Sequence, residues 1–404
     1  MTSNTRVVVI GAGLAGVRLA RRLGELGTPA LLVGEEEHAP YNRVLLAEVL
    51  AGRYAPEVIT LPSPAGLLRT RVTRIDRPAR TVACADGTSI AYDTLVLATG
   101  SNPVLPPLRG LFGPDHRLPE GVHAFRTMDD CLGLAAAVRP GVRAVVVGGG
   151  LLGVSAARAL AVRGAQVVLA QQAERLMERQ LDPDASRLVL RHLTDLGVET
   201  HTECRVRDVR CAGGAVRSVE LADGYALDAD LVVLACGVRP RTGLAEQAGL
   251  AVHKGVLVDD ELRTSDPRIH AVGDCAQHDG TVYGLAAPAL EQADALAELL
   301  AGDTDTRYRG TRSLTRLTLT GPDSPFDLAA FGETEARPGD DVVRLADATR
   351  GTYRKVVVRD DRLVGGVLVG ELGTVGTLAR AWEGAEPLPG DGPLLHLLTN
   401  DGGS

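Results

Sequence analysis

The sequence lacks the residue patterns that indicate a metal centre or a redox disulfide. Its six cysteines are scattered, and none forms a CxxC or CxxxxC pair. Its nine histidines form no HxxxH or HExxH pair. Iron–sulfur and zinc sites usually draw on such pairs at short intervals. We therefore predict no metal site, and we expect the cysteines to be structural residues.

The sequence also lacks a long apolar run and a surplus of basic residues. No apolar stretch approaches the roughly 20 residues that span a bilayer, and Met1–Arg6 shows no charged-then-apolar leader. The net charge of −8 argues against nucleic acid or an anionic membrane as the main partner. We predict a cytoplasmic protein whose 404 residues form two or three domains.

One glycine-rich motif is present twice. The apolar run Arg6–Ile10 precedes GAGLAG, the run Arg143–Val147 precedes GGGLLG, and each motif leads into a stretch of helical period. In this context the glycines allow a tight turn, close approach of a pyrophosphate, and packing of helix on strand. The helix N-terminus favours phosphate. The predicted contacts are Gly11, Gly13, Leu14, Ala15 and Gly16 in one dinucleotide site, and Gly148, Gly150, Leu151, Leu152 and Gly153 in a second.

The two predicted sites differ about twenty residues beyond each turn. Glu35, followed by Glu36, lies nineteen residues after Gly16 at the end of an apolar run. A carboxylate there accepts hydrogen bonds from ribose hydroxyls, so the first site suits FAD or NAD. The same offset in the second copy holds Gln172, with Arg175 nearby. A neutral amide neither chelates the ribose nor repels a 2′-phosphate, so the second site permits NADH or NADPH.

Small residues end three later apolar runs and complete a predicted flavin pocket. Glycine there lets the backbone pass close to a cofactor, and a carboxylate after glycine can bind sugar-like hydroxyls. A later helix, predicted within residues 284–300, can direct its N-terminal dipole at a reduced flavin ring. The residues predicted from these segments are Thr99, Gly100, Gly237, Gly273, Asp274, Ala287 and Pro288.

Over residues 6–302, the order of these motifs resembles that of the two-dinucleotide flavoproteins, which include glutathione reductase and the ferredoxin and rubredoxin reductases. The segments PYNRVLL (40–46), LMERQLD (176–182) and YGLAAP (283–288) are similar to the flavoprotein portion of assimilatory NAD(P)H nitrite reductases. The segments GTYRK (351–355) and RLVGGVLVG (362–370) resemble the small C-terminal module of that family.

The resemblance implies an FAD-dependent NAD(P)H oxidoreductase that passes electrons to a separate redox protein. The acceptor would be a ferredoxin-like carrier or a nitrite or nitrate reductase subunit. Arg43 would help hold the FAD, Glu35 its ribose and Asp274 its ribityl chain, while the second turn would hold NADH or NADPH. Two alternatives stay open: a stand-alone flavin oxidase or reductase acting on oxygen, a quinone or a small substrate, and a flavin-binding regulatory subunit. A monomer or a homodimer is expected.

Two positions depart from the family pattern. The glutamate usual after the second turn is Ser155, and a lysine common near the flavin in redoxin reductases is Glu48. If that lysine and glutamate pair near the flavin in relatives, this chain lacks both members. The nicotinamide is then expected to be placed differently. The chain also carries no siroheme-binding portion, so it is not expected to reduce nitrite alone.

These placements predict an α/β fold with two Rossmann-like domains and a small α+β C-terminal domain. Residues 1–115 and 243–310 should form the FAD domain, with the NAD(P)H domain, 116–242, inserted between them. Residues 311–395 alternate apolar and polar at period two and should form a β-rich domain closed by a helix at 375–382. That domain is either an interface module or a cap over the flavin. Residues 396–404 should be a tail.

Overall fold

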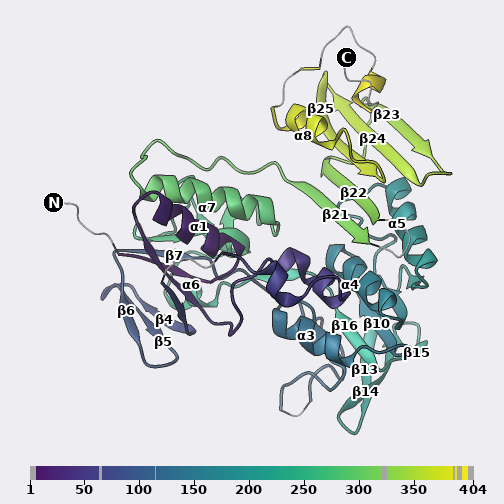
Figure 1. The fold of residues 1–404 in the computed structure, drawn as a ribbon, viewed down its shortest axis with the longest axis horizontal. Helices are drawn as coiled ribbons and strands as arrows, with labels where there is room; N and C mark the ends of the chain where they lie inside the picture. The colour runs from purple at the N-terminus through teal and green to yellow at the C-terminus, as the bar shows by residue number, and fades with distance from the viewer. Residues whose placement is uncertain are drawn as a thin grey trace.

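The computed structural model describes residues 6–62, 66–113, 115–320, 325–384, 387–388 and 394–398. Residues 1–5 at the N-terminus and residues 399–404 of the predicted tail lie outside the described residues. The chain forms two units, each built on a five-stranded parallel sheet, and a third part built on a five-stranded antiparallel sheet (Figure 1). No helix within these ranges is long and apolar enough to cross a membrane.

The first unit is built on a five-stranded parallel sheet. Its strands, in spatial order, are β3 (Leu67–Arg69), β2 (Ala30–Gly34), β1 (Val7–Ile10), β7 (Thr94–Leu97) and β19 (Ile269–Ala271). All four residues of β1 are buried, as expected for a strand covered on both faces. Val7 and Val9 pack toward two helices, α1 (Leu14–Glu25) and α7 (Ala286–Leu300). Val8 and Ile10 pack toward the opposite face.

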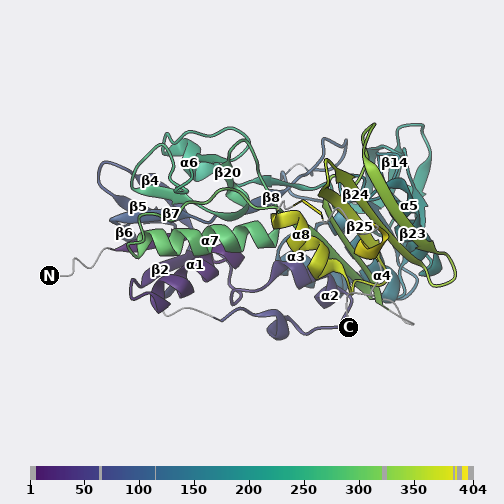
Figure 2. The same cartoon turned by 90° about the horizontal axis from the view of Figure 1, so that it is seen from above.

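That opposite face of the first unit is covered by a small antiparallel sheet and a short helix. These elements are β4 (Val72–Asp76), β5 (Thr81–Cys84), β6 (Ser89–Ala91) and α6 (Gly243–Gln247). A parallel pair, β18 (Val256–Val258) and β20 (Ala276–His278), contributes Val256 and Ala276 to the same core. The helices and the small sheet therefore enclose the central sheet as outer layers (Figure 2).

The second unit repeats this plan. Its parallel sheet has the order β12 (Glu199–His201), β11 (Gln166–Ala170), β10 (Arg143–Val147), β16 (Leu231–Leu234) and β9 (Val122–Ala124). One face packs on α3 (Met128–Ala137), α4 (Leu151–Val162) and α5 (Pro183–Asp195). The other packs on an antiparallel sheet of β13 (Val206–Ala212), β14 (Ala215–Leu221) and β15 (Ala226–Asp228). The duplicated motif therefore marks a duplicated unit.

Two strands mark where the chain passes between the units. β8 (Ser101–Pro103) on the way out pairs antiparallel with β17 (Val238–Pro240) on the way back. Beyond β8, Leu108 and Leu111 pack in the core of the second unit. A short helix, α2 (Leu46–Leu50), follows a 3-10 turn at Arg43–Leu45 and packs on both α3 and α4. The remaining 3-10 turns are Pro56–Ile59, Gly273–Cys275 and Leu394–Leu397.

The third sheet is antiparallel and is closed by a helix, as the period-two pattern predicts. Its order is β21 (Leu314–Thr320), β22 (Pro325–Gly332), β25 (Arg362–Val369), β24 (Thr352–Arg359) and β23 (Asp341–Asp347), with α8 (Val375–Gly384) packed on it. Both views place this sheet beside α4 and α5 of the second unit (Figures 1 and 2). Apolar residues of β21, β22, β24 and β25 join the helical core there.

A buried carboxylate fastens the third sheet to the second unit. Asp182, 2% exposed, ends the LMERQLD segment and caps α5 by accepting the N–H of Ala185 at 3.0 Å. Its Oδ2 accepts the Tyr353 hydroxyl at 2.7 Å and the Lys355 Nζ at 2.9 Å, both from the GTYRK segment. The LMERQLD and GTYRK segments, both of which resemble the family, therefore meet at Asp182. Tyr353 and Lys355 lie 171 and 173 residues after it in the chain.

Glycine packing in α1 yields the first testable prediction. A Cβ at Gly16 would lie 1.9 Å from the Gly11 carbonyl oxygen, whereas one at Gly24, in the same helix, would meet nothing within 4 Å. We expect Gly16→Ala to destabilise the protein by about 3 kcal/mol through overpacking. Gly24→Ala should stabilise it by about 0.5–1 kcal/mol. Urea unfolding followed by circular dichroism measures both; equal stability of the two variants would contradict the close packing.

The contact of Asp182 with Lys355 and Tyr353 can be tested by substitution. Asp182→Asn keeps a good helix cap but leaves the Lys355 ammonium without its buried counter-charge, which should cost about 3–5 kcal/mol. Tyr353→Phe, the control, removes one hydrogen bond to a charged group and should cost about 1.5 kcal/mol. Trp382, the single tryptophan, lies in α8, so its fluorescence follows unfolding of the third sheet. A wild-type unfolding curve for Asp182→Asn would refute the assigned role.

Candidate functional site

The first glycine turn has the shape of a phosphate-binding loop. Gly11 has φ +116°, and a Cβ there would lie 2.1 Å from the Ala98 carbonyl oxygen. Gly13 differs, since nothing lies within 4 Å of its Cβ position. It caps α1 in extended conformation without a side-chain hydrogen bond to the helix. Leu14 and Ala15 open the helix, so its positive end faces this space.

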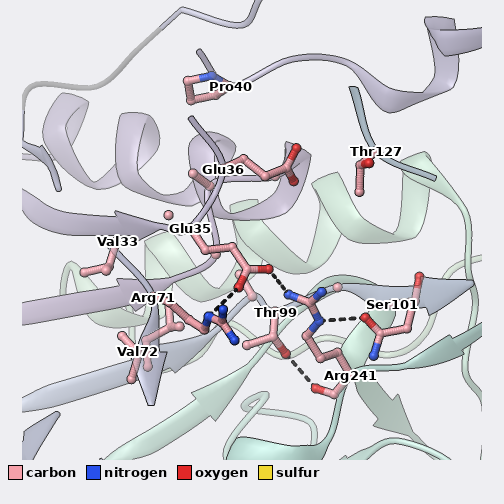
Figure 3. A pocket seen from close by; sticks show the side chains of 18 of the residues that line it. Val33, Glu35, Glu36, Pro40, Arg71, Val72, Thr99, Ser101, Thr127 and Arg241 are labelled. Carbon is pink, nitrogen blue, oxygen red and sulfur yellow. Dashed lines mark hydrogen bonds and ion pairs between the residues drawn. The ribbon is translucent and has the colours of Figure 1, made fainter. Parts of the chain in front are cut away.

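Gly11 and Gly13 border a cavity of about 570 Å³. Figure 3 shows this cavity from close by, with Glu35, Arg71 and Arg241 among its lining residues. Predicted residues Glu35, Glu36, Arg43, Thr99 and Gly100 also line it. The cavity carries four guanidinium groups, and carboxylates face them from the same walls. The lining arginines are Arg43, Arg71, Arg126 and Arg241.

Glu35 lies at the end of β2, where the spacing predicts a ribose-binding carboxylate. Its Oε1 binds Nη1 of Arg241, and its Oε2 lies 3.7 Å from Nε of Arg71 (Figure 3). The Arg241 side chain is also held by Asn102, whose Oδ1 accepts from Nε at 2.8 Å, and the Arg241 carbonyl accepts the Thr99 hydroxyl at 2.8 Å. Arg241, which directly follows β17 where the chain returns from the second unit, therefore places a cation beside the predicted ribose carboxylate Glu35.

Glu36 and Arg43 meet at a buried tyrosine. Arg43 binds Glu36 through Nη2 and donates from Nη1 to the Tyr41 hydroxyl at 2.8 Å. That hydroxyl donates to Glu36 Oε2 at 2.7 Å and accepts the N–H of Met128 at 2.8 Å. Burial, the largest effect, raises the pKa of Tyr41 well above its ordinary value. Tyr41 therefore stays neutral and holds Arg43 at the cavity wall.

Asp274 reaches the cavity through Arg126. Arg126 Nη2 lies 2.6 Å from Asp274 Oδ2 and 2.7 Å from the Ser101 hydroxyl, which donates to the same carboxylate oxygen at 2.8 Å. Both charged side chains are 17% exposed. Gly273 has φ +75°, and its Cβ position lies 3.1 Å from the Ala15 Cβ. The Gly-Asp turn is therefore brought against the start of α1.

The start of α7 lies beside the same turn. The N–H of Gly273 donates to Gln292 Oε1 at 2.7 Å, and a Cβ on Gly273 would lie 3.8 Å from the Ala289 Cβ. Ala287 is exposed and Pro288 is buried in the first turn of the helix. The helix that carries both predicted residues therefore packs against the Gly-Asp turn through Ala289 and Gln292, but neither Ala287 nor Pro288 lines the described cavity.

The second glycine turn repeats the geometry of the first. A Cβ at Gly148 would lie 2.5 Å from the Ala235 carbonyl oxygen, and one at Gly153 would lie 1.7 Å from the Gly148 carbonyl oxygen. Nothing lies within 4 Å of the Cβ position of Gly150, which caps α4 as Gly13 caps α1. Leu151 and Leu152 follow it as the half-buried first residues of α4.

The strand end beside the second turn differs from the first. Gln171, which sequence reasoning missed, accepts the Gly149 N–H on Oε1 at 2.7 Å and donates from Nε2 to the Arg175 carbonyl at 3.3 Å. The next residue, the predicted Gln172, is exposed. Gly237 lies at the crossing, where its carbonyl accepts the Val104 N–H at 2.9 Å. It does not line the described cavity.

The cationic residues were the main omission of the sequence reasoning. Arg71, Arg126 and Arg241 line the cavity, yet no spacing rule marks them, because their partners lie far away in the chain. Arg241 and Glu35 are 206 residues apart, and Arg126 and Asp274 are 148 apart. The only available signal was the position of Arg241 beside the returning proline-containing segment.

The cysteines do not supply a reactive thiolate next to the turns. Cys84, Cys131 and Cys275 are buried, and all six cysteines are free. Burial raises the pKa of Cys236, which follows β16, to about 11. Burial likewise raises the pKa of Cys275, the neighbour of Asp274. At neutral pH both thiols therefore stay protonated and are poor nucleophiles.

Comparison with known families agrees with this geometry. The family model for pyridine nucleotide-disulphide oxidoreductases matches residues 5–293, and that for the rubredoxin NAD+ reductase C-terminal domain matches residues 319–383. The chain is 34% identical, over 91% of its length, to the assimilatory nitrate reductase electron transfer subunit of Bacillus subtilis, of which it covers 48%. The chain spans less than half the length of that and other nitrate and nitrite reductase relatives.

Other similar proteins match end to end. The probable ferredoxin reductase CtmF of Castellaniella defragrans is 31% identical, with 90% of each chain covered. The solved putidaredoxin reductase–putidaredoxin complex superposes with a TM-score of 0.86 at 27% identity, covering 98% of this chain and 99% of that one. These matches confirm the predicted fold class and the resemblance. The chain belongs to the pyridine nucleotide-disulphide oxidoreductase family, whose members bind FAD and NAD(P)H.

Proposed function

We propose that this chain is an FAD-dependent NAD(P)H oxidoreductase that passes electrons to a separate redox protein. The observation that carries the proposal is the pair of glycine turns, each with an open side at Gly13 or Gly150 beside a helix N-terminus. One turn opens into the arginine-lined cavity. FAD, when bound, supplies the redox chemistry by taking a hydride from the nicotinamide, and the protein supplies binding and orientation.

The first unit fits FAD. Arg241 and Arg126 would face its pyrophosphate, because charge-assisted N–H donors and a helix N-terminus favour phosphate oxygens. Glu35 would accept the ribose hydroxyls, and Asp274, oriented by Arg126 and Ser101, would accept those of the ribityl chain. Arg43, held by Tyr41, would close the cavity wall. On this proposal residues 1–115 and 243–310 form the FAD domain, except that Leu108 and Leu111 pack in the core of the second unit.

The second unit, residues 116–242, would hold NAD(P)H. Its turn repeats the phosphate-binding geometry, and its strand end carries Gln171 and Gln172 where a carboxylate would select the ribose diol. Gln171 is committed to the Gly149 N–H, and Arg175 is bound to Glu174 and Glu335. Because no carboxylate occupies the strand end itself, the proposal leaves both NADH and NADPH as donors.

The acceptor would be a protein. The raised thiol pKa values of Cys236 and Cys275 argue against a cysteine relay to a small disulfide substrate. Relatives are named as an electron transfer subunit and a ferredoxin reductase, and one similar structure is a complex with putidaredoxin. We therefore propose a ferredoxin-like carrier or a nitrite or nitrate reductase subunit, with residues 311–395 as an interface module. The cytoplasmic location and a monomer or homodimer stay predictions.

Matched valine substitutions test which unit holds which nucleotide. Neither Gly13 nor Gly150 has an atom within 4 Å of its Cβ position, so Gly13→Val and Gly150→Val should both fold. Gly13→Val should be purified colourless, since its side chain fills the space of the FAD pyrophosphate. Gly150→Val should keep a full complement of FAD but need at least about tenfold more NAD(P)H for half-maximal flavin reduction. Reversed colours would contradict the assignment.

Anaerobic stopped-flow spectroscopy tests the reaction. Flavin absorbance should bleach on mixing with NADH or NADPH. The reduced protein should then be reoxidised faster by a ferredoxin or a nitrite or nitrate reductase subunit than by oxygen. Faster reoxidation by oxygen or a quinone would favour a stand-alone oxidase or reductase instead. Absence of bleaching with both nucleotides would favour a regulatory flavin-binding subunit.

A further inference from the structure

A buried ring of three side chains joins the two units and the third sheet. Arg158 of α4 is 1% exposed, and the side chain of Glu48 of α2 is 13% exposed. Arg158 Nη2 binds Glu48 Oε1, and its Nη1 lies 2.7 Å from the hydroxyl and 3.2 Å from the carbonyl of Thr320. Thr320, the last residue of β21, donates to Glu48 Oε2 at 3.1 Å. The three groups therefore bind one another, although Nε of Arg158 is buried without a hydrogen-bond partner.

The ring connects the elements that shape the two nucleotide sites. Arg158 lies two turns into α4, the helix whose N-terminus is capped by Gly150. Glu48 lies in α2, directly after the 3-10 turn that holds the cavity residue Arg43. The two helices pack on each other. A shift of this contact therefore moves one site relative to the other.

The polarity of the ring is opposite to the pair expected in relatives. There the lysine would be at the position of Glu48 and the glutamate at the position of Ser155. Here the carboxylate is on α2 and the cation is on α4, about one helical turn further along. Ser155 takes no part, since its hydroxyl donates to the Leu151 carbonyl at 2.8 Å within α4. From the sequence we expected the chain to lack both members of this pair. The structure instead has an ion pair with the charges exchanged, Glu48 on α2 and Arg158 on α4.

We propose that Glu48, Arg158 and Thr320 are positioning residues that set the geometry between the bound nicotinamide and the bound flavin. The inference rests on the function proposed above. A buried cation and carboxylate tolerate few arrangements, because separating them leaves an uncompensated charge in a dry interior. An apolar contact at the same point would pack but would slide more easily. Transfer between two rings is sensitive to placement, and a 1 Å error can cost about a hundredfold in rate.

Three variants of the FAD-loaded full chain separate positioning from stability. Glu48→Gln keeps the shape and removes the charge. The double variant Glu48→Met with Arg158→Met replaces the pair by apolar groups that can pack. Arg163→Met is the matched control, since Arg163 also reaches from α4 to α2, by one 3.4 Å hydrogen bond to the Leu50 carbonyl. The measurements are the limiting rate of flavin reduction, the nucleotide Kd, the long-wavelength absorbance of stacked rings, and the thermal midpoint.

We expect Glu48→Gln to lower the limiting rate about tenfold and weaken the stacking absorbance, with Kd changed less than about twofold. The double variant should regain the wild-type thermal midpoint while its rate stays low. Arg163→Met should match the wild type in all four measurements. Recovery of both midpoint and rate in the double variant would overturn the proposal, as would a loss confined to Kd.

A measurement without turnover keeps this inference separate from the proposed function. Hydrogen–deuterium exchange of the FAD-loaded full chain, measured without NAD(P)H, should rise in α2 and the first turns of α4 in Glu48→Gln but not in Arg163→Met. Unchanged exchange there would overturn the positioning role. Failure of the wild-type flavin to bleach with either nucleotide would overturn the proposed function, whereas the exchange measurement would still report whether the ring orders α2 and α4.

Discussion

The close approach of helix and strand at the first and third glycines is the constraint on which the rest of the structure depends. The carbonyl of Gly11 occupies the space that a side chain on Gly16 would need, and Gly148 and Gly153 repeat this contact. This contact brings each helix onto its own sheet and points its N-terminus toward the strand ends. The open side at the middle glycine follows from the same geometry, because the chain there has turned away from the sheet. Packing and phosphate binding therefore share one cause.

The two copies differ at the residue between the first two glycines of the turn and at the strand end that faces it. In the first turn Ala12 packs against Gly34, where a Cβ would lie only 2.6 Å away. In the second turn Gly149 faces Gln171, and a Cβ on Gly149 would collide with the side chains of Gln171 and Leu176. One residue of each facing pair must therefore be glycine, and this glycine lies on the strand end in the first unit and in the turn in the second. The second arrangement places an amide against the turn and leaves the strand end without a carboxylate.

Sequence reasoning reached the turns, because their chemistry is local. The spacing from Gly16 to Glu35 is set by one helix and one strand, so a single offset predicts a carboxylate at the end of β2, where Glu35 lines the cavity. It could not reach Arg126 or Arg241, because their partners lie 148 and 206 residues away and only the crossing of the chain between units brings them together. The same limit applied to Glu48: the sequence marks it as a departure from the family pattern, but its partner Arg158 follows only from the packing of α2 on α4.

The third sheet illustrates how a module can be tied to a nucleotide site without lining it. Asp182 closes the segment that follows the β11 strand end, and the same carboxylate binds Lys355 of the third sheet. Arg175, earlier in that segment, binds Glu335 in the loop between β22 and β23 of the third sheet. Thr320 of β21 completes the contact by binding Arg158 of α4 and Glu48 of α2. Hydrogen bonds are directional, so the hydrogen bonds at these three points fix the orientation of the third sheet as well as its proximity. The third sheet is therefore oriented by the same segments that shape the second nucleotide unit.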